Sequence, residues 1–139
     1  MIHGIFLPDV LLAAKAMYVG MDLLKSMFVK EGIPTIGKVV LGSVQGDSHD
    51  IGKNLAGIML RGVGFEAIDL GTNVTPWNFV EIAKREKVNI IGMSALLTTT
   101  MPIMRNVVEI LRGEELKGRI KTIIGGTSVS RRICERDRC

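Results

Sequence analysis

The segment 46–52, Gly-Asp-Ser-His-Asp-Ile-Gly, holds two residues with the chemistry of a metal site. A histidine can give one ring nitrogen to a metal while the other donates to a carboxylate, which fixes the tautomer and raises ligand basicity. Asp47 lies two residues before His49, within reach of that role, and Gly52 would let a bulky ligand approach the backbone. The bland alternative is a loop histidine beside an aspartate that caps a helix.

The elements on either side indicate where this segment lies. Residues 38–44 form an apolar run, typical of a parallel strand that is buried on both faces. Residues 52–62 have helical spacing. The segment is therefore predicted to be a loop at the carboxyl end of a strand, where open α/β sheets bind ligands.

The rest of the chain repeats this alternation of strand and helix. Further strands are predicted at 65–70, 88–93 and 120–124, and further helices at 76–86 and 101–113. Short loops and right-handed crossovers give a doubly wound parallel sheet of the flavodoxin-like (Rossmann-like) α/β class. By similarity to the flavodoxin-like order we expect the strands in the order 2-1-3-4, with strand two at an edge. Val74 and Trp77 are expected to pack rather than to function.

Three short motifs carry a resemblance to a known family. The pattern Asp-x-His-x-x-Gly at 47–52 resembles the cobalamin-binding signature of corrinoid proteins, methionine synthase and the B12-dependent mutases. Ser-Ala-Leu at 94–96 resembles the family's Ser-x-Leu, and Gly-Gly at 125–126 resembles its Gly-Gly. The motifs occur in the family's order, each at the carboxyl end of a predicted strand. The chain is most similar to the small corrinoid methyl-carrier proteins of methyltransferase systems.

The resemblance implies a set of site residues. Cobalamin or another cobamide would bind with its own base displaced from cobalt, and His49 would be the lower axial ligand to the metal. Asp47 would be the hydrogen-bond partner of His49, and Thr100 the hydroxyl that continues the relay. The other residues that the resemblance assigns to the cofactor are Ser48, Asp50, Ile51, Gly52, Ser94, Leu96, Thr98, Gly125 and Gly126.

The function implied is methyl carriage by a cofactor-carrying subunit. The partners would be a donor-specific methyltransferase, an acceptor methyltransferase that uses tetrahydrofolate or coenzyme M, and a reductive activase. Two alternatives keep the cofactor: the cobalamin-binding subunit of a B12-dependent mutase, and a cobalamin-sensing regulator. A third, from a different class, is a cofactor-free flavodoxin-like interaction module.

The N-terminal segment is predicted to be one helix over 8–30. Its Phe-Leu-Pro-Asp at 6–9 and Ala-Ala-Lys-Ala-Met at 13–17 resemble the last helix of the family's four-helix cap. We therefore divide the chain into a cap remnant with its connector, 1–34, and a cobalamin-binding domain, 35–139, truncated at both ends relative to the family. An apolar stripe runs along the helix through Leu11, Leu12, Ala14, Met17, Tyr18, Met21, Leu24 and Phe28. The stripe is wider than one packing face, which predicts a homodimer through this helix or packing over the corrin.

Composition excludes several other classes of protein. The 139 residues carry a net charge of +4, and half of it lies in the weakly apolar tail 131–139, for which no strand is expected. No basic stripe with interleaved aromatic residues indicates nucleic acid. No run reaches transmembrane length and no secretory signal opens the chain, so a cytoplasmic protein without a membrane partner is expected. Cys134 and Cys139 are expected to form neither a structural disulfide nor a zinc site.

Overall fold

The computed structural model describes residues 35–116, 118–127 and 129, together with residues 8, 9, 12, 13, 15, 16, 19 and 20. The chain divides into two compact units, Met1–Thr35 and Ile36–Cys139. The described N-terminal residues are helical, in agreement with the helix predicted there. The rest of that helix, most of its apolar stripe and the predicted tail lie outside the described residues. None of the helices in the described ranges is long and apolar enough to cross a membrane.

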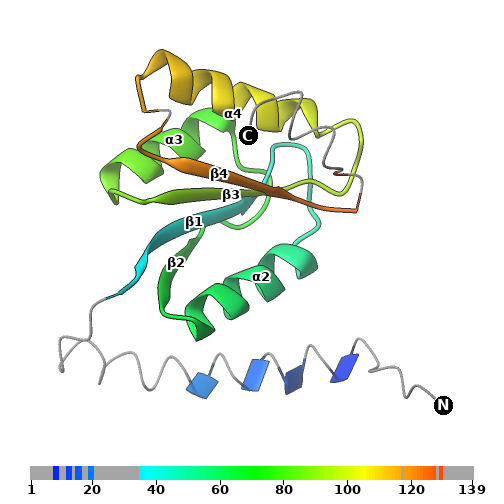
Figure 1. Ribbon diagram of the computed structural model, residues 1–139. Helices are drawn as coiled ribbons and strands as arrows, with labels where there is room; N and C mark the ends of the chain where they lie inside the picture. Colours follow the sequence, from blue (N-terminus) through cyan, green and yellow to red (C-terminus); the bar gives the residue numbers. More distant parts are fainter. Residues whose placement is uncertain are drawn as a thin grey trace. The chain divides into compact units, whose positions relative to one another are not determined.

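In its described residues, the second unit has one sheet of four parallel strands with three helices around it (Figure 1). The strands are β1 Gly37–Ser43, β2 Phe65–Asp69, β3 Ile90–Ser94 and β4 Lys121–Gly125, and the helices are α2 Ile51–Gly62, α3 Pro76–Arg85 and α4 Pro102–Gly113. The order across the sheet is β2-β1-β3-β4. The predicted α/β class and strand order are confirmed.

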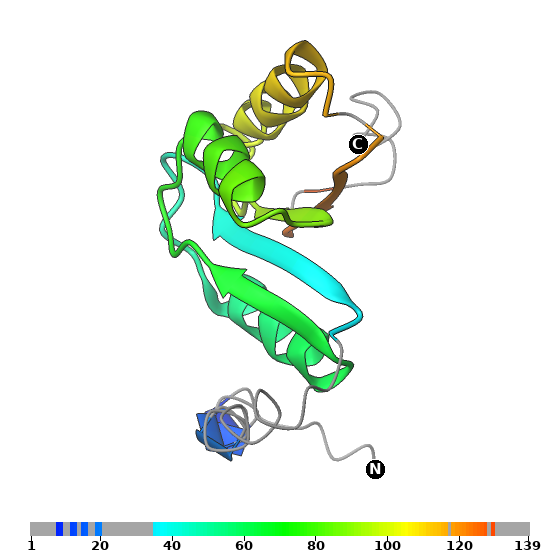
Figure 2. The same ribbon diagram turned by 90° about the vertical axis from the view of Figure 1, so that its left-hand side faces the viewer.

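The helices form two layers of unequal size. Figure 1 and the turned view in Figure 2 show α3 and α4 together on one face of the sheet and α2 on the other. From β1 the chain passes through α2 to β2 on one side, and from β3 it passes through α4 to β4 on the other. The loops after the neighbouring strands β1 and β3 therefore lead in opposite directions. The carboxyl ends of these two strands form the switch point of the sheet.

The main core lies between the sheet and the pair α3 and α4. Val40 of β1, Phe79 of α3, Ile91 of β3 and Leu111 of α4 are all almost fully buried. Gly42 allows this close packing, because a Cβ there would lie 2.8 Å from the ring of Phe79. Burial runs along both central strands, which explains why their sequences are continuous apolar runs rather than alternating ones.

Two local predictions differ from the structure. The strand predicted at 88–93 ends one residue later, so that Ser94 is the last residue of β3, where it pairs with Ser43 of β1 and Gly125 of β4. Val74 is buried as expected, whereas Trp77 is 57% exposed, so the prediction that it packs is wrong. Trp77 is the second residue of α3, and the buried residues of that helix are Phe79, Val80 and Ala83.

Candidate functional site

The loop after β1 turns sharply and is held from within. Gly46 has a φ of +82°, in the left-handed region that favours glycine, and the main-chain N–H of Asp47 donates to the carbonyl of Val44 at 2.9 Å. The hydroxyl of Ser43, buried at the end of β1, donates to the main-chain carbonyl of His49 at 2.5 Å. The strand therefore holds the main chain of the histidine directly.

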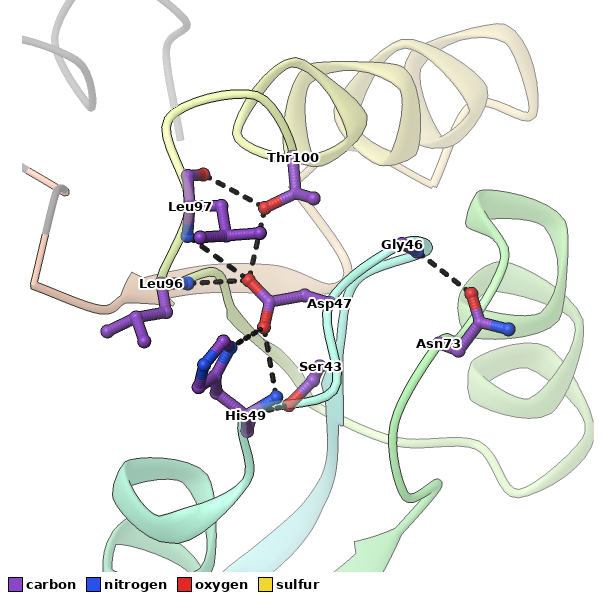
Figure 3. Close-up of polar contacts among 8 residues, drawn as sticks. All are labelled: Ser43, Gly46, Asp47, His49, Asn73, Leu96, Leu97 and Thr100. Carbon is purple, nitrogen blue, oxygen red and sulfur yellow. Dashed lines mark hydrogen bonds and ion pairs between the residues drawn. The ribbon is translucent and has the colours of Figure 1, made fainter.

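The Asp47 carboxylate is the centre of the site (Figure 3). It is 1% exposed. Its Oδ1 accepts the main-chain N–H of His49 at 3.0 Å and lies 2.8 Å from the ring Nδ1 of His49. Its Oδ2 accepts the main-chain N–H groups of Leu96 at 2.7 Å and Leu97 at 3.3 Å. One buried side chain thus joins the loop after β1 to the loop after β3.

These contacts decide the charge of Asp47. Burial, the largest single influence, would raise the pKa of Asp47, but hydrogen bonds from the main chain and ring of His49 and from two main-chain N–H groups after β3 outweigh burial. They hold the pKa of Asp47 well below its usual range. Asp47 is therefore an ionised acceptor at neutral pH.

An ionised carboxylate next to Nδ1 fixes the state of the His49 ring. A carboxylate can only accept, so Nδ1 carries the proton and, in the neutral ring, Nε2 presents its lone pair. The His49 side chain is 52% exposed, so the ring can be approached from outside the protein. Imidazoles that bind metals are commonly oriented by a carboxylate in this way.

Thr100 completes the group of polar side chains. Its hydroxyl oxygen lies 3.1 Å from Oδ2 of Asp47 and 2.9 Å from the carbonyl oxygen of Leu97. A hydroxyl has one proton, so it donates to one of these acceptors at a time. Thr100 is 7% exposed. The structure therefore brings together all three residues of the expected relay, Asp47, His49 and Thr100.

A groove of about 270 Å³ lies on the α2 side of the sheet. Its apolar walls come mainly from α2, β3 and β4. The residues that line it are Leu41, Gly52, Lys53, Ala56, Leu60, Gly92, Met93, Ser94, Ile123, Ile124, Gly125 and Gly126. Four of the predicted site residues, Gly52, Ser94, Gly125 and Gly126, therefore share one groove.

The glycines of the groove differ in why they lack a side chain. A Cβ on Gly52 or Gly125 would meet nothing within 4 Å, so these two positions leave open space. A Cβ on Gly126 would overlap with the carbonyl oxygen of Ala95, and its φ of +135° also disfavours a side chain. Gly126 is thus required by the backbone itself, in addition to any room that it leaves for a ligand.

The chain matches the family of B12 binding domains over residues 37–136. The chain belongs to this family. A corrinoid protein of Desulfitobacterium hafniense (strain Y51) is 44% identical over 128 residues, which cover 90% of this chain and 59% of that protein. Dimethylamine corrinoid protein 3 of Methanosarcina mazei is 44% identical over 123 residues, which cover 88% of this chain and 74% of that protein.

Solved structures agree with this assignment. The methanol:cobalamin methyltransferase complex MtaBC from Methanosarcina barkeri contains a chain that matches with a TM-score of 0.80 at 33% identity, over 95% of this chain and 50% of that one. This B12-binding domain thus spans about three fifths of the Desulfitobacterium corrinoid protein and half of the Methanosarcina barkeri chain. The resemblance to corrinoid proteins of methyltransferase systems is confirmed.

The remaining predicted residues lie around the His49 loop in less defined roles. Ser48 and Ile51 are exposed, and the Asp50 carboxylate accepts the side-chain amide of Asn54 at 3.1 Å. Leu96 donates its main-chain N–H to Asp47, a contact that cannot be predicted from the type of its side chain. Thr98 is exposed and is not among the described residues that line the groove.

Sequence reasoning missed two residues that hold the His49 loop. Ser43 holds the His49 carbonyl. Asn73, in the loop after β2, accepts the Gly46 N–H on its side chain at 2.8 Å and donates its own main-chain N–H to the Asp47 carbonyl at 3.1 Å. Asn73 has a positive φ of 56°, which asparagine tolerates better than most residues. An asparagine at a loop after a parallel strand was the available signal.

Proposed function

We propose that this chain is the cofactor-binding part of a corrinoid protein that carries a methyl group between two methyltransferases. The observation that carries the proposal is the 2.8 Å contact between Asp47 Oδ1 and His49 Nδ1, with the ring half-exposed at the switch point of a B12-binding fold. One imidazole is a sufficient protein ligand for a metal that a macrocycle already holds. The donor set therefore fits a cobamide.

His49 would be the residue that holds the cobalt of a cobamide, through Nε2. When bound, the cobamide supplies a metal centre that takes up and releases a methyl group. Asp47 would keep the proton on Nδ1, so that Nε2 stays available to bind the metal. The Thr100 hydroxyl can turn between Asp47 and the Leu97 carbonyl, which lets it stabilise either charge state of the pair.

The groove would hold the nucleotide tail of the cobamide. It is apolar and lined by glycines at two open positions, Gly52 and Gly125, which suits a flat aromatic base. Ser94, half-buried at the end of β3, would offer a hydroxyl to the tail. The other predicted contacts, from Ser48, Asp50, Ile51, Leu96 and Thr98, would lie under or beside the corrin.

The carrier role is supported by the relatives. Those reported above are named as corrinoid proteins, one of them for dimethylamine, and a chain of similar fold occurs in a methanol:cobalamin methyltransferase complex. These names favour a methyl carrier over a mutase subunit or a regulator. The donor methyltransferase, the acceptor methyltransferase and the reductive activase remain part of the proposal for this chain.

The test is the nitrogen that binds cobalt. Protein labelled with ¹⁵N-histidine and loaded with cobalamin in the cobalt(II) state should show ¹⁵N splitting in its paramagnetic resonance spectrum, whereas free cobalamin shows ¹⁴N from its own base. His49→Ala should abolish the ¹⁵N splitting and weaken binding by more than about tenfold, since loss of even an outer-shell partner costs about 10–100-fold in metal affinity. A spectrum with ¹⁴N from the cobamide's base in the wild type would overturn the proposal.

A further inference from the structure

Lys53 occupies an unfavourable position in the first turn of α2. Its side chain is 3% exposed, although lysine is almost never fully buried unless it is paired. A positive charge at the start of a helix opposes the helix dipole, and α2 has no acidic residue in its first turn. Departures from local rules are expected where a residue has a functional role.

The buried amine is tied to the end of strand β2. Lys53 Nζ lies 2.7 and 2.8 Å from the two carboxylate oxygens of Asp69, and it donates to the side chain of Asn54 at 2.6 Å. Asp69 is 43% exposed, so the pair has one buried and one accessible member. This ion pair connects α2, which starts directly after the His49 loop, to the end of β2.

Asp69 in turn holds the loop that supports the site. Its Oδ1 accepts the main-chain N–H of Gly71 at 2.8 Å, and the Gly71 carbonyl accepts the N–H of Ser43 at 3.0 Å. Two residues further along, Asn73 binds Gly46 and the main chain of Asp47, as described above. The loop after β2 therefore contacts the His49 loop at its start.

The two sets of contacts close a ring around the His49 loop. The start of that loop is held by Asn73, and its end continues into α2, which Lys53 ties back to Asp69 in the same supporting segment. We propose that the Lys53–Asp69 pair is a positioning device that sets the orientation of the His49 ring toward the metal. This inference rests on the proposed function and adds Lys53 and Asp69 to its machinery.

The test compares two substitutions at the accessible member of the pair. Asp69→Asn removes the charge while its amide oxygen can still accept the Gly71 N–H, whereas Asp69→Glu keeps a carboxylate. Asp69→Asn should lower the fraction of cobalt(II) coordinated by histidine and weaken cobalamin binding about tenfold, the low end of the range for residues that contact a metal ligand directly. Asp69→Glu should retain most of both. Lys53→Met should behave like Asp69→Asn.

A second measurement uses the protein without cofactor. Amide hydrogen exchange at His49 and Asn73 reports local opening of the two loops. It should become about tenfold faster in Asp69→Asn and stay unchanged in Lys84→Met, which breaks the exposed Lys84–Glu114 ion pair between α3 and the end of α4. If Lys53→Met does not fold, the comparison of Asp69→Asn with Asp69→Glu decides.

The outcomes separate this inference from the proposed function. If the wild type binds cobalamin through His49 and Asp69→Asn does so equally well, with unchanged exchange, the inference is wrong while the function stands. A second outcome is that the loss of histidine coordination in Asp69→Asn matches its loss in free energy of unfolding, with Lys84→Met showing the same relation between the two quantities. In that case the pair only stabilises the fold, and the inference is also wrong. If the wild type shows no histidine coordination, the proposed function fails, and the exchange experiment still decides whether the pair holds the loop.

Discussion

Nδ1 of His49 lies 2.8 Å from Oδ1 of Asp47, and the other oxygen of the same carboxylate is bound by the main chain after β3. The exposed histidine is therefore oriented by a buried group that a second strand holds in place. This geometry gives the histidine a fixed tautomer without burying it. Two measurable consequences concern the Asp47 side of this contact.

Asp47→Asn should destabilise the protein without cofactor. In the wild type, both oxygens of the carboxylate accept hydrogen bonds, whereas the amide of asparagine would place an NH₂ group against some of these donors. Leaving buried donors without an acceptor costs about 1–3 kcal/mol in the free energy of unfolding. Urea denaturation of the apo protein measures the difference. Asp50→Asn is the matched control, because Asp50 lies in the same loop but its carboxylate accepts the Asn54 side chain. Equal stability of wild type and Asp47→Asn would contradict the hydrogen-bond network.

The stabilisation by Asp47 should disappear in acid. Folding lowers the pKa of Asp47, so its contribution is fully present above the unfolded-state pKa of about 4 and is lost as pH falls through the lower folded-state pKa. The difference in unfolding free energy between wild type and Asp47→Asn should be constant from about pH 7 to 5 and shrink below about pH 4. Denaturation curves over this range measure it. A difference that grows on acidification would have the wrong sign.

Gly125→Val should block the groove without disturbing the fold. The new side chain would extend into open space, so apo stability should change by less than about 0.5 kcal/mol, while binding of cobalamin should fall. Binding of cobinamide, which lacks the nucleotide tail, should be affected much less. Titration followed by absorbance measures both. Equal loss for both ligands would show that the tail does not enter this groove.

Gly126→Val is expected to act differently. Its side chain would overlap with the Ala95 carbonyl and its φ of +135° is unfavourable for valine, so the apo protein itself should lose stability. Thermal unfolding of the two valine variants should therefore separate them. If Gly126→Val is as stable as the wild type, the close approach of Gly126 to the Ala95 carbonyl is wrong.

The apolar stripe of the N-terminal helix still predicts self-association. Each such side chain is worth about 1.5–3 kcal/mol when buried, so a stripe wider than one packing face favours a homodimer. Sedimentation at low micromolar concentration should show a dimer that Met17→Glu dissociates. Lys15→Glu, a charge change two residues away on an exposed helical residue, should leave it intact. A monomeric wild type would refute the dimer.

The sequence by itself determined the fold class and the Asp47–His49 pair, and similarity to the flavodoxin-like order gave the strand order. Continuous apolar runs specify buried parallel strands, and an aspartate two residues before a histidine in a tight loop is a local relationship. The three motifs then bring Gly52, Ser94 and Gly125 to one edge, because carboxyl ends of parallel strands meet there.

Only the tertiary structure decided how the site is held. The contacts of Asn73 with Gly46 and of Lys53 with Asp69 join segments that are separate along the chain, so neither periodicity nor spacing predicts them. Gly126 is fixed by the Ala95 carbonyl of another loop rather than by a ligand alone. Local sequence patterns encode which face of an element is apolar, whereas the partner of a buried polar group depends on which strands become neighbours.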